Sequence, residues 1–189
     1  KTIIYIPSVI SPIIVGLTWS SFLQYNGLLN KGMRSIGLSR FVVDWLGDPS
    51  VVKNTLVLLN TWQFAGVGMV IFLAGLNSIP AHINESSALD GATGFTKFRR
   101  ITLPLIMPSV TIVMFLGITG ALKVFDIPFI LTQGGPVNAS QMVTMSIYDN
   151  AFRFEKFGLS SAMGVVFFLL IAAITLVQLQ VTRKKEVEY

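Results

Sequence analysis

Five polar side chains and one aromatic ring lie within or beside long apolar segments, and they are well placed to contact a polar solute. A charged group at membrane depth costs about 2.5–3.5 kcal/mol on insertion scales, so it usually faces a cavity or a partner. Amide and hydroxyl groups match the hydroxyl groups of a sugar, and aromatic rings cover its apolar face. The candidates for such a solute path are Ser8, Asn60, Gln63, Phe64, Lys123 and Asp126.

Structural roles compete with this interpretation. Asn60 and Gln63 are three residues apart and share a helical face, where amides also bond neighbouring helices to each other. Lys123 and Asp126 have the same spacing, so we expect them on one helical face, where they can pair near the membrane surface. The residues alone leave both interpretations open.

Residue types needed for catalysis or metal binding are nearly absent. The chain has no cysteine and a single histidine, His82, so thiol chemistry, disulfides and a zinc site are not expected. No glycine-rich loop ends in Lys-Ser or Lys-Thr, the pattern that cradles nucleotide phosphates. We therefore expect no enzyme activity, no catalytic or metal-binding residues and no cofactor bound by this chain.

The elements that position these residues are set by four long segments without any charged side chain. The chain is 52% hydrophobic and 12% charged, with a mean hydropathy of +0.69, far more apolar than a soluble domain. A helix of about 20 apolar residues crosses a bilayer core, and uninterrupted apolar runs of that length exclude barrel strands. The sequence predicts an all-α polytopic membrane protein with four spans, at about 3–23, 52–75, 105–131 and 158–181.

Local signals add detail before the second span. Pro7 and Pro12 interrupt the first span and are expected to kink it. Residues 27–37 favour a short helix at the membrane surface, and Asp48 followed by Pro49 predicts the start of the next helix. The net charge of +5 comes from bases in loops and tail without interleaved aromatics, which indicates contact with a lipid bilayer and not with nucleic acid.

A polar loop of about 77–104 separates the second and third spans. Ser78 is a candidate N-cap, residues 80–90 are expected to form one short helix, and Gly91 fits the C′ position where only glycine turns without strain. A second short helix is expected from about 94 to 101. Such a helix–glycine–helix elbow is compact enough to dock into a partner and transmit a push.

The spacing in this loop resembles the cytoplasmic signature loop of ABC-importer permease subunits. Glu-x-x-Ala-x-x-Gly is followed after nine residues by Ile-x-Leu-Pro. The chain departs from the family at one place: the usual Glu-Ala-Ala is Glu-Ser-Ser, which lowers helix propensity somewhat. In that family the loop docks into a groove on the ATP-hydrolysing subunit. The resemblance assigns ATPase coupling to Glu85, Ser86, Ser87, Ala88, Asp90, Gly91, Ile101, Leu103 and Pro104.

The resemblance covers nearly the whole chain and favours the carbohydrate-uptake branch, that is, maltose- or glycerol-phosphate-type permeases. Its marks include Leu131-Thr-Gln-Gly-Gly-Pro136 and Trp45-Leu-Gly-Asp-Pro49. It implies the type I importer fold, with residues 1–189 as the C-terminal part of a single transmembrane domain. It also implies a sugar or sugar-like cargo moved by alternating access.

The partners implied by the resemblance are ABC ATPase subunits, a homologous second permease and an extracellular solute-binding protein. ATP and Mg²⁺ would be bound by the ATPase. The expected location is a prokaryotic plasma (inner) membrane. Basic residues divide almost evenly between the two sides, but the cluster at Arg183, Lys184 and Lys185 favours a cytoplasmic tail over 182–189.

Two alternatives remain open from the sequence. The first is an ABC importer for a non-sugar solute, since the candidate solute-path residues do not exclude one. The second is an ion-coupled secondary transporter in which Lys123 and Asp126 form the coupling pair.

Overall fold

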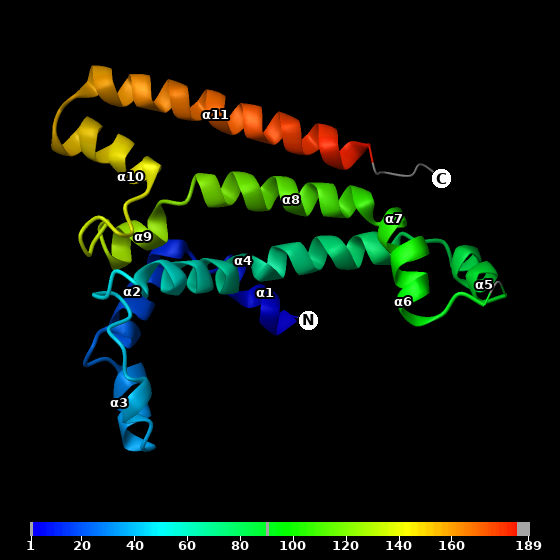
Figure 1. Ribbon diagram of the computed structural model, residues 1–189, viewed down its shortest axis with the longest axis horizontal. Helices are drawn as coiled ribbons and strands as arrows, with labels where there is room; N and C mark the ends of the chain where they lie inside the picture. The colour runs from blue at the N-terminus through cyan, green and yellow to red at the C-terminus, as the bar shows by residue number, and fades with distance from the viewer. Residues whose placement is uncertain (1, 90, 185–189) are drawn as a thin grey trace. The chain divides into compact units, whose positions relative to one another are not determined.

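The computed structural model describes residues 2–89 and 91–184, and every regular element in this part of the chain is a helix (Figure 1). The predicted all-α fold is therefore confirmed. The α-helices are α1 (Thr2–Val9), α2 (Pro12–Leu23), α3 (Leu28–Ser35), α4 (Val52–Asn77), α5 (Ala81–Leu89), α6 (Gly94–Lys97), α7 (Leu103–Leu105), α8 (Met107–Leu122), α9 (Asp126–Leu131), α10 (Val143–Tyr148) and α11 (Phe157–Arg183). A 3₁₀ turn, η1 (Ser39–Phe41), and two π-helical turns, η2 (Phe98–Thr102) and η3 (Asp149–Arg153), complete them.

The chain divides into two compact units. The first unit comprises Lys1–Ala65 and Lys123–Val166, and the second comprises Gly66–Leu122 and Phe167–Tyr189. Helices α4 and α11 each contribute one part to each unit.

Three stretches among the described residues are long and apolar enough to cross a bilayer: Val52–Asn77, Met107–Leu131 and Phe157–Arg183. A helix of 26 residues such as α4 is about 39 Å long, which exceeds the roughly 30 Å of a hydrocarbon core. The last of these stretches, α11, has 27 residues. A fourth span exists if α1 and the segment after it are counted as one broken span.

The first predicted span is bent much more sharply than a proline kink. Thr2–Val9 and Pro12–Ser35 meet at 101°. The break lies at Ile10 and Ser11, immediately before Pro12 opens α2, because proline disfavours helical backbone in the residue before it. Pro7 lies inside α1 without ending it.

The third predicted span is not one continuous helix. Helix α8 ends at Leu122, and α9 begins only at Asp126. The expectation that Lys123 and Asp126 share a helical face is therefore wrong.

In the first unit, the core joins the start of α4 to α9. Val52, Leu56 and Ile127 are buried together, and Leu131 and Met142 pack against them. Helix α2 lies on α9 so closely that a Cβ added at Gly16 would come within 3.0 Å of Ile130 Cγ2.

The segment between α2 and α4 is held by one buried amide. Asn30 of α3 is fully buried; its Nδ2 donates to the carbonyls of Tyr25 (3.1 Å) and Val43 (2.8 Å). Its Oδ1 accepts a hydrogen bond from Trp45 Nε1 at 3.0 Å. The short helix predicted over 27–37 is confirmed as α3.

Asp48 does not cap α4 as expected, because α4 begins only at Val52; Asp48 instead closes a turn just before the helix. Asp48 Oδ1 accepts hydrogen bonds from the hydroxyl (2.6 Å) and backbone N–H (2.8 Å) of Ser50, two residues ahead at the entrance to α4. These two bonds stabilise the carboxylate and lower the pKa of Asp48 below its ordinary value.

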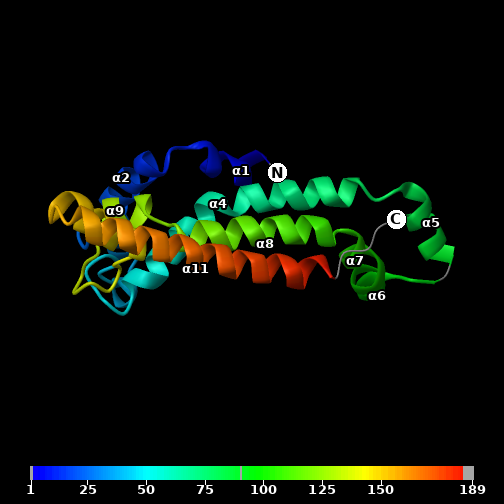
Figure 2. The same cartoon turned by 90° about the horizontal axis from the view of Figure 1, so that it is seen from above.

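In the second unit, the end of α4 and the start of α8 form an antiparallel hairpin, and α11 lies along α8 (Figure 2). Small residues bring the hairpin helices together. A Cβ at Gly75 would collide with Ser109 Oγ and come within 3.0 Å of Ser109 Cβ, while one at Gly68 would meet Val113 Cγ1 at 3.4 Å.

Candidate functional site

Helices α5, α6 and α7 gather at the end of the α4–α8 hairpin and form a polar projection from it (Figure 1). We call residues 78–105 the elbow. Helix α5 ends at Leu89, Gly91 follows with φ +73°, and the N–H of Ala92 donates to the carbonyl of Ser87 at 2.9 Å. This six-to-one bond with a left-handed residue at C′ is a Schellman motif. The turning role predicted for Gly91 is therefore confirmed.

Ser78, between α4 and α5, does not cap α5. The Ser78 hydroxyl donates back to the carbonyl of Gly75 at 2.8 Å, where it satisfies the C-terminal end of α4. The N-cap role expected for Ser78 is wrong, because α5 begins only at Ala81 and Pro80 stands immediately before it.

The predicted coupling residues occupy both arms of the elbow. On α5, Glu85 and Ser86 are exposed, and Ser87 is buried. Ile101, Leu103 and Pro104 are half-buried on η2 and α7, where the chain returns to α8. The side chain of Ala88 and the whole of Asp90 lie outside the described residues.

The second arm presents an apolar pair that the sequence analysis missed. Phe95 is 73% exposed and Phe98 is 47% exposed, and their ring centroids are 6.4 Å apart. Exposed aromatic groups of this kind mark contact surfaces for partners. The signal available in the sequence was two phenylalanines inside an otherwise basic loop, beside the exposed Arg99 and Arg100.

The solute-path candidates on α4 do not share one environment. Gln63 is fully buried, and its Nε2 donates to the carbonyl of Ile10 at 3.1 Å. Asn60 is half-buried, and Phe64 is 43% exposed. Ser8, on α1, donates its hydroxyl to the carbonyl of Tyr5 at 2.7 Å. The structure thus brings Gln63 to the break between α1 and α2 and leaves Asn60 and Phe64 partly open.

The expected pair of Lys123 and Asp126 does not form. Both side chains are exposed, on opposite sides of the break between α8 and α9. Within residues 2–89 and 91–184, the one ion pair is between Arg153 Nη1 and Asp149 Oδ1, at 3.5 Å.

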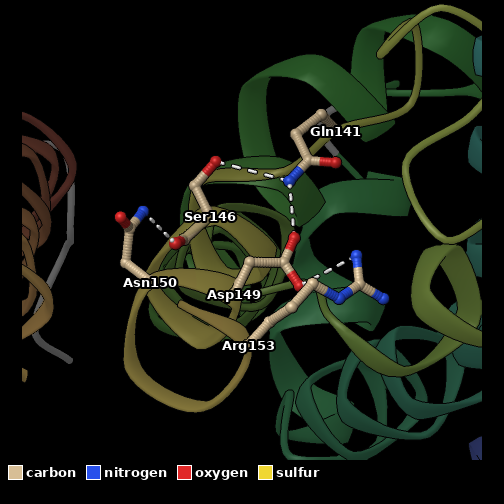
Figure 3. Close-up of polar contacts among 5 residues, drawn as sticks. All are labelled: Gln141, Ser146, Asp149, Asn150 and Arg153. Carbon is tan, nitrogen blue, oxygen red and sulfur yellow. Dashed lines mark hydrogen bonds and ion pairs between the residues drawn. The ribbon is translucent and has the colours of Figure 1, made fainter. Parts of the chain in front are cut away.

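That ion pair belongs to a polar cluster on α10 and η3 that the sequence analysis did not identify (Figure 3). Asp149 Oδ2 accepts a hydrogen bond from Gln141 Nε2 at 3.3 Å, and Gln141 Nε2 also reaches Ser146 Oγ at 3.5 Å. Asn150 Nδ2 donates to the carbonyl of Ser146 at 2.8 Å. These contacts hold Gln141, which precedes α10, against α10 and η3.

A series of four aromatic rings stands beside the cluster. Phe125 stacks on Phe129 at 4.8 Å, Tyr148 lies edge-on to Phe129 at 5.2 Å, and Phe152 follows Tyr148 at 5.1 Å. Phe125 and Phe129 are half-buried, whereas Phe152 is 69% exposed. Phe125 and Phe129 are four residues apart, as are Tyr148 and Phe152. The contact between these two pairs, at Phe129 and Tyr148, was not evident from the sequence.

Residues 1–187 match the model of the family described as binding-protein-dependent transport system inner membrane component. The chain is 35% identical over 192 residues to the "Probable starch degradation products transport system permease protein AmyD" of Thermoanaerobacterium thermosulfurigenes, covering 100% of this chain and 63% of that protein. It is 34% identical over 184 residues to the "Trehalose/maltose transport system permease protein MalF" of Thermococcus litoralis, covering 97% and 61%.

The fold also has a close counterpart among solved structures. A chain in the crystal structure of a bacterial alginate ABC transporter, in complex with its alginate pentasaccharide-bound periplasmic protein, superposes with a TM-score of 0.84 at 27% identity, covering 97% of this chain and 64% of that chain. This chain therefore spans just over three fifths of the length of these relatives. The predicted resemblance and the ABC-importer permease fold are confirmed.

Proposed function

Because the chain belongs to the family of binding-protein-dependent transport system inner membrane components, we propose that it is the C-terminal part of a sugar-importing permease. It is a multi-pass membrane subunit. The single observation that carries the proposal is the elbow, a polar helix–turn–helix projection placed between two candidate spans and bearing the coupling motif.

The proposed mechanism is alternating access. ATP would close a partner ATPase dimer, the elbow would move with the ATPase, and the α4–α8 hairpin would transmit that movement to the spans. The close approach of α4 and α8 at Gly75 and Ser109 suits the hairpin to this task, because a close contact transmits displacement from one helix to the other. ATP and Mg²⁺ would bind to the partner, and this chain would bind no cofactor.

The proposed cargo is a sugar or an oligosaccharide. Support comes from the names of similar proteins, which refer to starch degradation products, trehalose, maltose and alginate. Asn60 and Phe64, partly open on one helix, offer an amide and a ring to such a solute. Lys123 and Asp126 are proposed as separate contacts and not as a pair.

The proposed assembly contains two ATPase subunits, a homologous second permease and an extracellular solute-binding protein. The alginate transporter offers a parallel for the last of these, since its title describes a periplasmic protein loaded with a pentasaccharide. The C-terminal tail and the elbow would face the cytoplasm of a prokaryotic cell.

The test of this function is solute-stimulated ATP hydrolysis and uptake by the full importer in proteoliposomes. A panel of oligosaccharides, amino acids and short peptides would be presented with the binding protein. Stimulation by an oligosaccharide and uptake that survives a protonophore are expected. Stimulation only by an amino acid or peptide would refute the sugar cargo, and uptake abolished by the protonophore without ATP dependence would refute the importer.

A further inference from the structure

A groove of about 350 Å³ runs between α8 and α11 in the second unit, and the proposed transport mechanism does not use it. Its lining residues on α8 recur at helical spacing over about 10 Å, so they form one continuous face. Two more lie one turn apart on α11. The lining consists of Pro108, Thr111, Ile112, Phe115, Leu179 and Arg183.

The groove is apolar along its length and cationic at one end. Arg183 is the first charged residue after the charge-free segment 157–182, so its guanidinium lies where α11 leaves the apolar layer. That guanidinium is exposed, and it makes no ion pair or hydrogen bond with any other described residue. Deeper in the groove, Ile112 is 49% exposed and available to a partner of the same apolar character.

One buried polar contact joins the two walls, and a second lies within α11. Gln178 of α11 is 8% exposed, and its Nε2 lies 3.5 Å from the carbonyl of Thr111 on α8 and 3.2 Å from Thr182 Oγ1. The contact between Gln178 and Thr111 lies beside the groove and links its two walls.

We propose that this groove binds one anionic glycerophospholipid. Arg183 holds the phosphate, and an acyl chain lies against Ile112, Phe115 and Leu179. The charge pattern favours this occupant: a guanidinium at the membrane surface, at the end of an apolar groove, complements an anionic headgroup above its own hydrocarbon chain. A transmembrane helix of a partner protein would fill the apolar part but leave the guanidinium unpaired in the membrane interface.

The test is native mass spectrometry of the purified full importer, titrated separately with phosphatidylglycerol and phosphatidylcholine. Wild type is expected to retain one phosphatidylglycerol more tightly than Arg183→Gln, by about fivefold, the effect of one basic residue near an anionic surface. Arg183→Lys should keep most of the affinity. Lys184→Gln, which removes the neighbouring charge outside the groove, is the matched control and should change binding much less.

A second measurement uses the unaltered protein. A phosphatidylglycerol carrying a photoreactive acyl chain should label peptides containing Ile112, Phe115 or Leu179. Equal lipid retention in wild type and Arg183→Gln, or labelling confined to other segments, would overturn the proposal. So would a disulfide crosslink from Ile112→Cys to a cysteine in the second permease, since a protein would then occupy the groove. None of these outcomes depends on the transported solute.

Discussion

The amide of Gln63 satisfies a carbonyl that the break between α1 and α2 leaves without a helical partner. Its Nε2 donates to Ile10, 53 residues earlier in the chain, and the side chain is fully buried. Buried carbonyls without a hydrogen bond are costly, so this contact fixes the break in place. Among the solute-path candidates, Gln63 therefore has a structural task within this chain, and Asn60 remains the more open amide.

Replacing Gln63 by methionine should lower stability and leave solute affinity unchanged. The substitution leaves the buried Ile10 carbonyl without a hydrogen bond, which costs about 1–3 kcal/mol of stability. We expect the low end of that range, because methionine also removes Gln63 Oε1, a buried atom with no hydrogen-bond partner. Thermal unfolding of the purified importer, together with the KM for solute, measures both effects.

The matched variant is Asn60→Ala, which should raise the KM with little change in melting temperature. If Gln63→Met raised the KM at unchanged stability, its assignment as a structural contact would be wrong.

The stability of the turn before α4 is expected to depend on pH through Asp48. Because hydrogen bonds from Ser50 lower the pKa of Asp48, this turn contributes stability above the ordinary pKa of the carboxyl and loses it as the pH falls through the lowered value. The melting temperature of wild type should exceed that of Asp48→Asn at pH 6 and converge with it toward pH 3. A difference that persists unchanged at pH 3 would show that the carboxylate charge is irrelevant.

At the scale of elements, the α4–α8 hairpin sets the position of the elbow. Its contact surface requires a residue without a side chain at Gly75, where even a methyl group presses on Ser109. Gly68, two turns earlier, leaves room for one methyl group against Val113. At these two glycines the approach is closer at Gly75, near the elbow, where the proposed ATPase partner would act.

Gly75→Leu should destabilise the importer by about 1–3 kcal/mol, the usual cost of overpacking a close helix contact. It should also reduce the number of solute molecules transported per ATP. Gly68→Ala is the matched control, and it should be tolerated in both measurements. Normal stability and coupling in Gly75→Leu would show that the helices do not need this close approach.

Much of the arrangement of helices was predictable from the sequence. The features that were not predicted have local physical causes. Charge-free segments of helical length predicted the regions of α4 and α11, and the glycine at C′ predicted the turn at Gly91. Proline located the start of α2 but not the bend of 101°, which depends on Gln63 and on packing against α9. The break at 123–125 has no proline or glycine to announce it. Pairings such as Phe129 with Tyr148 join distant segments, so periodicity within one segment does not reveal them.

At the scale of the whole molecule, the elbow is the proposed link between the membrane spans and a partner ATPase. The backbone turns at Gly91, which has a positive φ, and the space where a side chain would stand is open. Proline cannot adopt that φ, so Gly91→Pro should abolish uptake while ATP hydrolysis by the assembled importer continues. Asparagine tolerates the left-handed region, so Gly91→Asn should retain most transport. Normal uptake in Gly91→Pro would remove the coupling role.

The most direct test of the central claim exploits the absence of cysteine in these 189 residues. A single Ser86→Cys, exposed on α5, would be placed in the full-length protein, with any native cysteines elsewhere replaced, and coupled to a photo-crosslinker in native membranes. The adducts would be identified by mass spectrometry. If the elbow docks on an ATPase, we expect an adduct with a protein that carries a nucleotide-binding Gly-x-x-x-x-Gly-Lys-Ser/Thr loop. Efficient labelling that yields adducts only with lipid or with a second copy of this chain would contradict it.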